Sequence, residues 1–81
     1  MPESIYHPRY QALREAMIAA RKKAGLTQVQ MAERLAVGQS YVSKIERGES
    51  YVDIITYVDW VTACGRKPGE LLNALIDVTG G

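Results

Sequence analysis

The chain has 81 residues, of which 47% are hydrophobic and 23% are charged, and its formal net charge at pH 7 is +1. This length fits one small domain, whose limited core makes oligomerisation a reasonable expectation. The chain has no apolar run long enough to cross a bilayer, no basic and apolar leader of the secretory kind, and a single cysteine, Cys64, which excludes an internal disulfide. We therefore expect a cytoplasmic protein that does not associate with membranes.

The charges are divided unevenly along the chain. Residues 1–48 contain 8 Lys and Arg against 4 Asp and Glu, which gives +4, whereas residues 49–81 contain 2 against 5, which gives −3. A basic half can orient a protein on the phosphates of a nucleic acid, although such a division can also arise by chance in a short chain.

The hydrophobic pattern predicts five helices and no strands. The first helix begins at Pro8, a residue suited to the opening helical position, and ends at Gly25. Its apolar residues recur at steps of three and four positions, as one face of a helix requires: Tyr10, Leu13, Met17, Ala20 and Ala24. Residues 1–7 are predicted to form a loose N-terminal arm.

A second helix is predicted to start at Thr27. Thr27 and Gln30 match the capping box, in which a hydroxyl and a side-chain amide satisfy the first backbone N–H groups of a helix. Val29, Ala32 and Leu35 are expected to form the inner face of this helix.

The third helix, predicted over residues 39–47 after a tight turn, carries a polar stripe. Positions 40, 43, 44 and 47 share one face, opposite the inward-facing Val42 and Ile45. A stripe of this kind, on a helix supported by the helix before it, is how helix-turn-helix proteins read the edges of DNA bases. Taken alone, the stripe is better explained as a solvated helix face.

Two further helices complete the predicted domain, which spans residues 8–78. Asp53 is suited to cap a helix that runs to Cys64, and a fifth helix begins near Pro68. Residues 79–81 are expected to fray.

These last two helices carry more apolar residues than one inner face needs. We interpret the excess as a dimer interface; its predicted members are Tyr57, Trp60, Cys64, Leu72, Leu75 and Ile76. The alternative is that the small core of the domain absorbs them.

Two motifs resemble those of the Cro/C1-type (XRE) helix-turn-helix family: Gly-Leu-Thr-Gln at residues 25–28 and Ser-Lys-Ile-Glu-Arg-Gly at residues 43–48. The resemblance covers about residues 8–76. It implies an all-α, compact five-helix lambda-repressor-like domain that binds double-stranded DNA as a twofold homodimer, with the helix at residues 39–47 in the major groove.

The resemblance also suggests roles for individual side chains. Those expected to read bases are Gln39, Ser40, Ser43 and Lys44. Those expected to contact phosphates are Gln28, Arg47, Tyr41, Lys22, Lys23 and Ser50. Glu46 is expected to form a structural salt bridge with Arg21 that fixes the third helix against the first. For the surface residues, the alternative is ordinary solvation.

Three positions depart from the family pattern. Ala36 stands where glycine is common because the backbone there is left-handed, which would strain alanine by about 1 kcal/mol. Gly38 caps the third helix more weakly than serine or threonine would. Lys67 occupies a position where the fifth helix usually has a capping side chain.

The sequence thus predicts a prokaryotic transcriptional regulator, expected to be a repressor, that binds an inverted-repeat operator as a homodimer. The alternatives are an antitoxin that pairs with a toxin and regulates its own gene, an activator that contacts RNA polymerase, and a protein-interaction module on the same fold. Enzymatic activity and a cofactor are not expected, because the single histidine, His7, and Cys64 have no nearby partners for a metal site or a nucleophilic pair.

Overall fold

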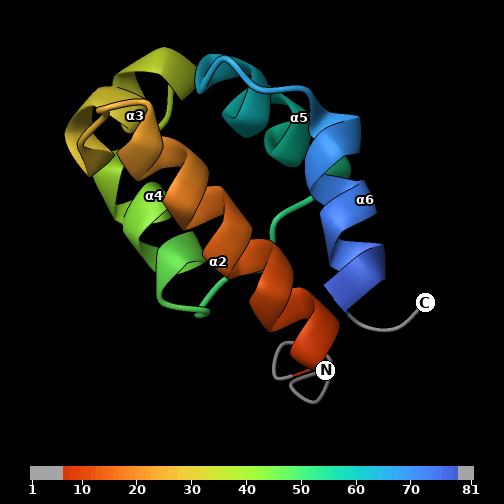
Figure 1. Ribbon diagram of the computed structural model, residues 1–81. Helices are drawn as coiled ribbons and strands as arrows, with labels where there is room; N and C mark the ends of the chain where they lie inside the picture. The colour runs from red at the N-terminus through yellow and green to blue at the C-terminus, as the bar shows by residue number, and fades with distance from the viewer. Residues whose placement is uncertain (1–6, 79–81) are drawn as a thin grey trace.

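The computed structural model describes residues 7–78, with side chains described through residue 73, and this part of the chain is all-helical (Figure 1). The helices are α2 (Pro8–Lys23), α3 (Gln28–Leu35), α4 (Gln39–Glu46), α5 (Ile54–Ala63) and α6 (Pro68–Val78). The prediction of a five-helix, all-α domain is therefore confirmed for the described residues.

Helix α2 runs through the molecule and contacts α4, α5 and α6, while α3 packs against both α4 and α5 (Figure 1). Helices α5 and α6 contact each other on the side away from α4. The helix-turn-helix pair α3–α4 is thus supported from behind by α2 and α5, which leaves one side of α4 uncovered by any other described helix.

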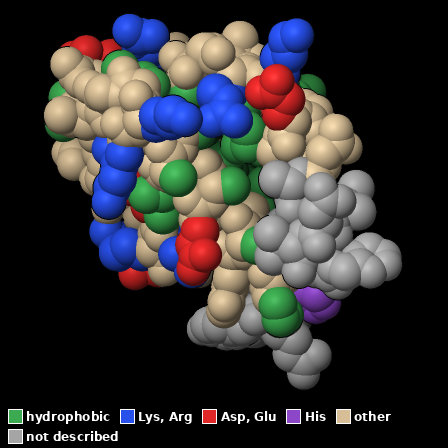
Figure 2. Space-filling model, in the orientation of Figure 1, with side chains coloured by type: hydrophobic (Ala, Val, Ile, Leu, Met, Phe, Trp, Pro, Cys, Tyr) green, Lys and Arg blue, Asp and Glu red, His purple; other side chains and the backbone are tan. Residues whose placement is uncertain are grey.

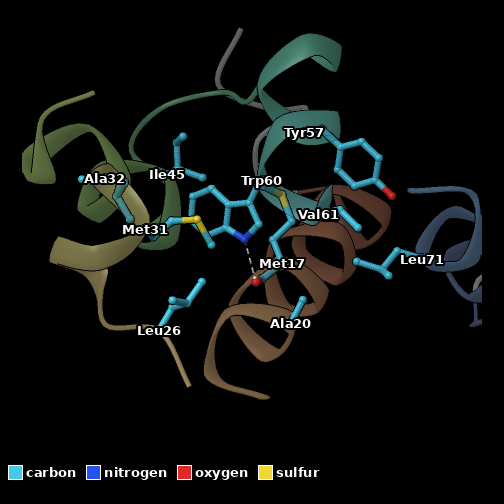
Figure 3. Close-up of a cluster of buried hydrophobic side chains, with 11 residues drawn as sticks. Met17, Ala20, Leu26, Met31, Ala32, Ile45, Tyr57, Trp60, Val61 and Leu71 are labelled. Atoms are coloured by element: carbon cyan, nitrogen blue, oxygen red, sulfur yellow. Dashed lines mark hydrogen bonds between the residues drawn. The ribbon is translucent and has the colours of Figure 1, made fainter. Parts of the chain in front are cut away.

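Trp60 lies at the centre of the hydrophobic core (Figure 3). Its side chain is 0% exposed and lies among Met31 and Ile45 on one side and Met17 and Val61 on the other. The indole Nε1 donates a hydrogen bond to the Met17 carbonyl at 2.9 Å, so the polar atom of this buried aromatic ring is satisfied. One residue of α5 therefore joins the packing of α2, α3 and α4.

The burial of α5 corrects the predicted dimer interface. Trp60 and Tyr57, 0% and 2% exposed, belong to the core of the single chain, and the Tyr57 hydroxyl donates to the Pro68 carbonyl at 2.5 Å. The prediction is wrong for these two residues, because a domain this small uses its largest aromatic side chains for its own core. Cys64 also packs partly against the core, whereas Leu72 is exposed. The side chains of Leu75 and Ile76 lie outside the described residues.

The inner face of α3 also differs from its prediction. Met31 and Ala32 are buried with Leu35 packed beside them, whereas Val29 is 49% exposed. Val29 lies roughly a third of a turn from the centre of the buried face. Spacing alone could not distinguish the two arrangements, because both sets of residues recur at helical intervals.

The helix ends follow local signals. Both halves of the capping box are present, with the Thr27 hydroxyl accepting from the Gln30 amide at 3.1 Å and the Gln30 side chain accepting from the Thr27 amide at 2.9 Å. Asp53 caps α5 by accepting from the Thr56 amide at 2.8 Å. His7, which the pattern placed in the arm, instead caps α2 through its Nδ1, which accepts from the Arg9 amide at 3.0 Å. The rest of the predicted arm and the predicted tail lie outside the described residues.

Candidate nucleic-acid interface

The turn between α3 and α4 has the left-handed residue that the family resemblance implied. Ala36 has φ 58° and ψ 43°, and Gly38 is the N-cap of α4 without a side chain to donate to or accept from it. The Val37 amide donates to the Ala32 carbonyl at 3.0 Å, which closes the end of α3. This short turn fixes the direction in which α4 leaves α3.

A buried ion pair anchors the far end of α4. The Arg21 guanidinium, in the last turn of α2, donates from Nε to Glu46 Oε2 at 2.5 Å and from Nη2 to Glu46 Oε1 at 3.0 Å. Only 9% of the Arg21 side chain and 7% of the Glu46 side chain are exposed. Arg21 Nη1 also donates to the Leu26 carbonyl at 2.7 Å, so the same side chain holds the loop between α2 and α3. The expected pair is present and joins three segments of the chain.

A chain of side-chain hydrogen bonds leads from this ion pair to the surface. Gln28 Nε2 donates to Glu46 Oε1 at 2.9 Å, and Gln39 Nε2 donates to Gln28 Oε1 at 3.4 Å. Gln28 is therefore partly buried and oriented by Glu46, whereas Gln39 is exposed at the start of α4. Their connection was not predicted, since Gln28 and Glu46 lie 18 positions apart in the chain.

The polar stripe of α4 faces away from the core. Gln39, Ser40 and Lys44 are exposed and Ser43 is half-buried, while Val42 and Ile45 are buried on the opposite side. The four predicted base-reading residues thus share one accessible helix face. Several Lys and Arg side chains lie on the left of the space-filling view, the side of α3 and α4 (Figure 2). Lys22 and Lys23 are exposed in the last turn of α2.

Arg47, directly after α4, is engaged by its neighbours. Its Nε and Nη2 each donate to a carboxylate oxygen of Glu49 at 3.0 Å, and its Nη1 donates to the Ser43 hydroxyl. The hydrogen bond and the charge of Arg47 lower the pKa of Glu49, and the same contacts raise the pKa of Arg47. Glu49 was not among the residues predicted to belong to the site.

The loop after α4 is held by two α2 residues: Tyr10, which was predicted only as part of an apolar helix face, and Arg14, for which no role was predicted. The Tyr10 hydroxyl donates to the Ser50 carbonyl and accepts from the Val52 amide, both at 3.1 Å. Arg14 Nη1 donates to the Glu46 carbonyl at 2.7 Å. Ser50 therefore lies in an ordered loop beside the end of α4.

Tyr41, the remaining predicted phosphate contact, is half-buried and packs partly against the core.

The comparisons with known proteins agree with this geometry. A helix-turn-helix family model matches residues 17–71, which extend from the middle of α2 to the start of α6. This chain belongs to the Cro/C1-type (XRE) helix-turn-helix family. Its structure is similar to that of an XRE-family like protein from Pseudomonas syringae pv. tomato str. DC3000, with a TM-score of 0.87, 40% sequence identity, and coverage of 95% of this chain and 94% of that chain. No curated protein matches the sequence.

XRE-family membership identifies the chain as a DNA-binding transcription regulator, on a fold that is not typically enzymatic. Within the described residues, no group of three or more His, Cys, Asp and Glu side chains is arranged to hold a metal ion. No helix in the same part of the XRE-family chain is both long and apolar enough to span a membrane.

Proposed function

We propose that this XRE-family protein is a sequence-specific repressor that binds an inverted-repeat operator as a homodimer, with α4 in the major groove of each half-site. The observation that carries the proposal is the anchoring of α4. A buried ion pair holds its C-terminal end against α2, while its opposite face is polar and exposed. A rigid helix with an accessible polar face can enter the groove without reorganisation, and occupancy of a promoter would exclude polymerase.

Gln39 is the proposed base-reading residue with the best-defined orientation. One of the two hydrogens on its Nε2 points to Gln28 Oε1, which leaves the second hydrogen and Oε1 for a base. That pair of groups fits the N7 and N6 edge of adenine. Lys44 is suited to donate to guanine O6 and N7, whereas Ser40 and Ser43 are short and permit several bases.

The proposed phosphate contacts surround this face. Lys22 and Lys23 supply charge from the end of α2, and Arg47 supplies it from the end of α4. Gln28, Tyr41 and Ser50 are proposed to contribute hydrogen bonds. Such contacts set the register on the duplex and make the affinity depend on salt.

For the homodimer, we propose that a second copy packs on the exposed apolar face of α5, formed by Ile54, Ile55 and Val58. Ile54 and Ile55 are 63% and 66% exposed, and Val58 lies one turn after Ile54 on the same side of the helix. The face follows directly after the loop that leaves α4, so a twofold contact there would bring two recognition helices into one complex. Three residues bury less area than the roughly 1,200 Å² of a stable interface, so the dimer would form mainly on DNA.

Sedimentation of the protein with and without operator DNA tests this interface. Ile55→Ser should prevent two copies from assembling on one operator. Leu72→Ser, which likewise replaces an exposed apolar side chain by serine but on α6, should not. If only Leu72→Ser prevented assembly, the interface would lie on α6 instead of α5.

DNA binding is tested by fluorescence anisotropy with a duplex from upstream of the protein's own gene, at two salt concentrations. Lys44→Met should weaken binding and relax the base preference, whereas Lys23→Met should weaken binding to all duplexes and lower the salt slope by about 0.9. Lys67→Met is the control, because it removes the same charge from an exposed lysine next to α6. Absence of specific, salt-sensitive binding, together with a stable complex with a neighbouring gene product, would favour the antitoxin or interaction-module alternative.

A further inference from the structure

The residue that follows the recognition helix and its glycine stop is acidic, although it lies among proposed DNA contacts. Glu49 is two residues after Arg47, and both side chains are about half exposed, 54% and 53%. Its backbone is fixed by a 2.8 Å hydrogen bond from its amide to the Lys44 carbonyl. The preceding Gly48 has φ +77°, a left-handed conformation that turns the chain back toward α4. The turn itself therefore places the Glu49 carboxylate beside Arg47.

This placement engages all three nitrogens of the Arg47 guanidinium. Two of its nitrogens donate to the two oxygens of Glu49, and the third donates to the Ser43 hydroxyl. A paired carboxylate mimics the arrangement of acceptors that a phosphate offers to arginine. Arg47 in turn contacts Ser43, a proposed base-reading residue, so the side chain that Glu49 holds is linked to a second member of the proposed interface.

We propose that Glu49 competes with DNA phosphate for Arg47 within the same chain. This competition limits the affinity for DNA, so that tight binding is confined to sites where base contacts compensate for the loss of the Arg47–Glu49 pair. The inference rests on the proposed DNA-binding function. In the DNA-free protein, Glu49 neutralises Arg47 at the end of α4. When a phosphate approaches, it replaces the carboxylate, and the displaced negative charge remains close to the DNA backbone and to Lys44.

The exchange lowers affinity without regard to sequence, because phosphates carry no base information. Removal of the competitor should therefore strengthen binding to nonspecific DNA at least as much as binding to the operator. It should also steepen the salt dependence of DNA binding. Arg47 would then neutralise a phosphate, and release its counterion from the DNA, without first giving up an internal partner.

The experiment measures affinity by anisotropy for the upstream duplex and for a scrambled duplex, with wild type, Glu49→Gln, Arg47→Ala and the double variant. Glu49→Gln should tighten binding to both duplexes by about two- to fivefold, the range expected for release of one exposed ion pair. In the Arg47→Ala background the same substitution should have a much smaller effect. Glu70→Gln is the matched control, because it removes the acidic member of another exposed ion pair, Arg66–Glu70, with the same change in net charge.

The outcomes separate this inference from the proposed function. If wild type binds the upstream duplex specifically but Glu49→Gln binds no better than wild type, or more weakly, Glu49 does not compete and instead positions Arg47 or has no role. If Glu70→Gln tightens binding equally, net charge is the cause and the inference is overturned. If wild type binds neither duplex, the proposed function fails and the inference fails with it. An NMR titration in which the Glu49 pKa is the same in wild type and Arg47→Ala would show that the pair does not form in solution, which also overturns the inference.

Discussion

The buried Arg21–Glu46 pair gives the sharpest test of how the recognition helix is held. In Glu46→Gln, the shape of the side chain is retained but its charge is lost. Glu46 accepts hydrogen bonds from two nitrogens of Arg21 and from Gln28, whereas a glutamine amide can accept only through its single oxygen. At least one donor would then face an N–H group, and the buried Arg21 charge would lose its partner.

Removal of one member of a buried pair costs about 3–5 kcal/mol. A domain of 81 residues has a total free energy of unfolding of about 4–12 kcal/mol, so the substitution would remove a large part of it. For a domain of this size each kcal/mol shifts the melting temperature by about 4–8 °C, which gives a fall of at least about 12 °C.

The assay is urea denaturation followed by far-UV circular dichroism, with DNA binding measured on the fraction that remains folded. Glu49→Gln is the control, because it removes an exposed carboxylate from the same end of α4 and should change the unfolding midpoint little. A loss of less than about 1 kcal/mol in Glu46→Gln, with unchanged DNA binding, would refute the reasoning. The paired substitution Arg21→Met with Glu46→Leu separates the two roles: stability should recover, since apolar pairs can replace buried ions, while DNA binding should not.

Three further predictions concern stability. Ala36→Gly should raise the free energy of unfolding by up to about 1 kcal/mol, because glycine adopts the left-handed conformation of Ala36 without strain, and a lower urea midpoint would contradict this. Trp60→Ala should lower the free energy of unfolding by about 3–5 kcal/mol through loss of core packing. A variant that loses dimerisation without losing stability would instead show that Trp60 belongs to a dimer interface. The hydrogen bond from the Thr56 amide lowers the pKa of Asp53, so its ionised form stabilises the fold above its ordinary pKa, and this contribution is lost as pH falls through the lowered value. Wild type should therefore have a higher urea midpoint than Asp53→Asn at neutral pH, and the difference should disappear in acid. A difference that does not change with pH would show that the ionised carboxylate is not its source.

Features that depend on a few consecutive residues were predictable from the sequence. The capping box of Thr27 and Gln30 and the cap at Asp53 each involve hydrogen bonds within about one helical turn. The order of the five helices followed for the same reason. The left-handed turn at Ala36 was expected from the family resemblance, not from the residue itself. His7 was missed as a cap because histidine is not among the preferred N-cap residues.

The assignment of apolar residues to surfaces was less predictable. The sequence of α5 is apolar on nearly all sides, so its helical period does not indicate which of Ile55, Tyr57 and Trp60 meets the same chain. The core of this small domain takes the two aromatic side chains and leaves Ile55 exposed. Val29 was misplaced on α3 for the same reason, since only the packing of α4 and α5 against α3 selects which of its faces is buried.

The sequence by itself determined the polar stripe of α4 and, through the family resemblance, the expected partnership of Arg21 with Glu46. Only the tertiary structure decided how the stripe is connected. The links from Glu46 through Gln28 to Gln39, and from Tyr10 to the loop at Ser50, join residues far apart in the chain. The pairing of Arg47 with Glu49 is short-range, but it depends on the side-chain directions set by the turn at Gly48. Periodicity can state which side of a helix is polar, whereas the partner of each polar atom follows from packing in three dimensions.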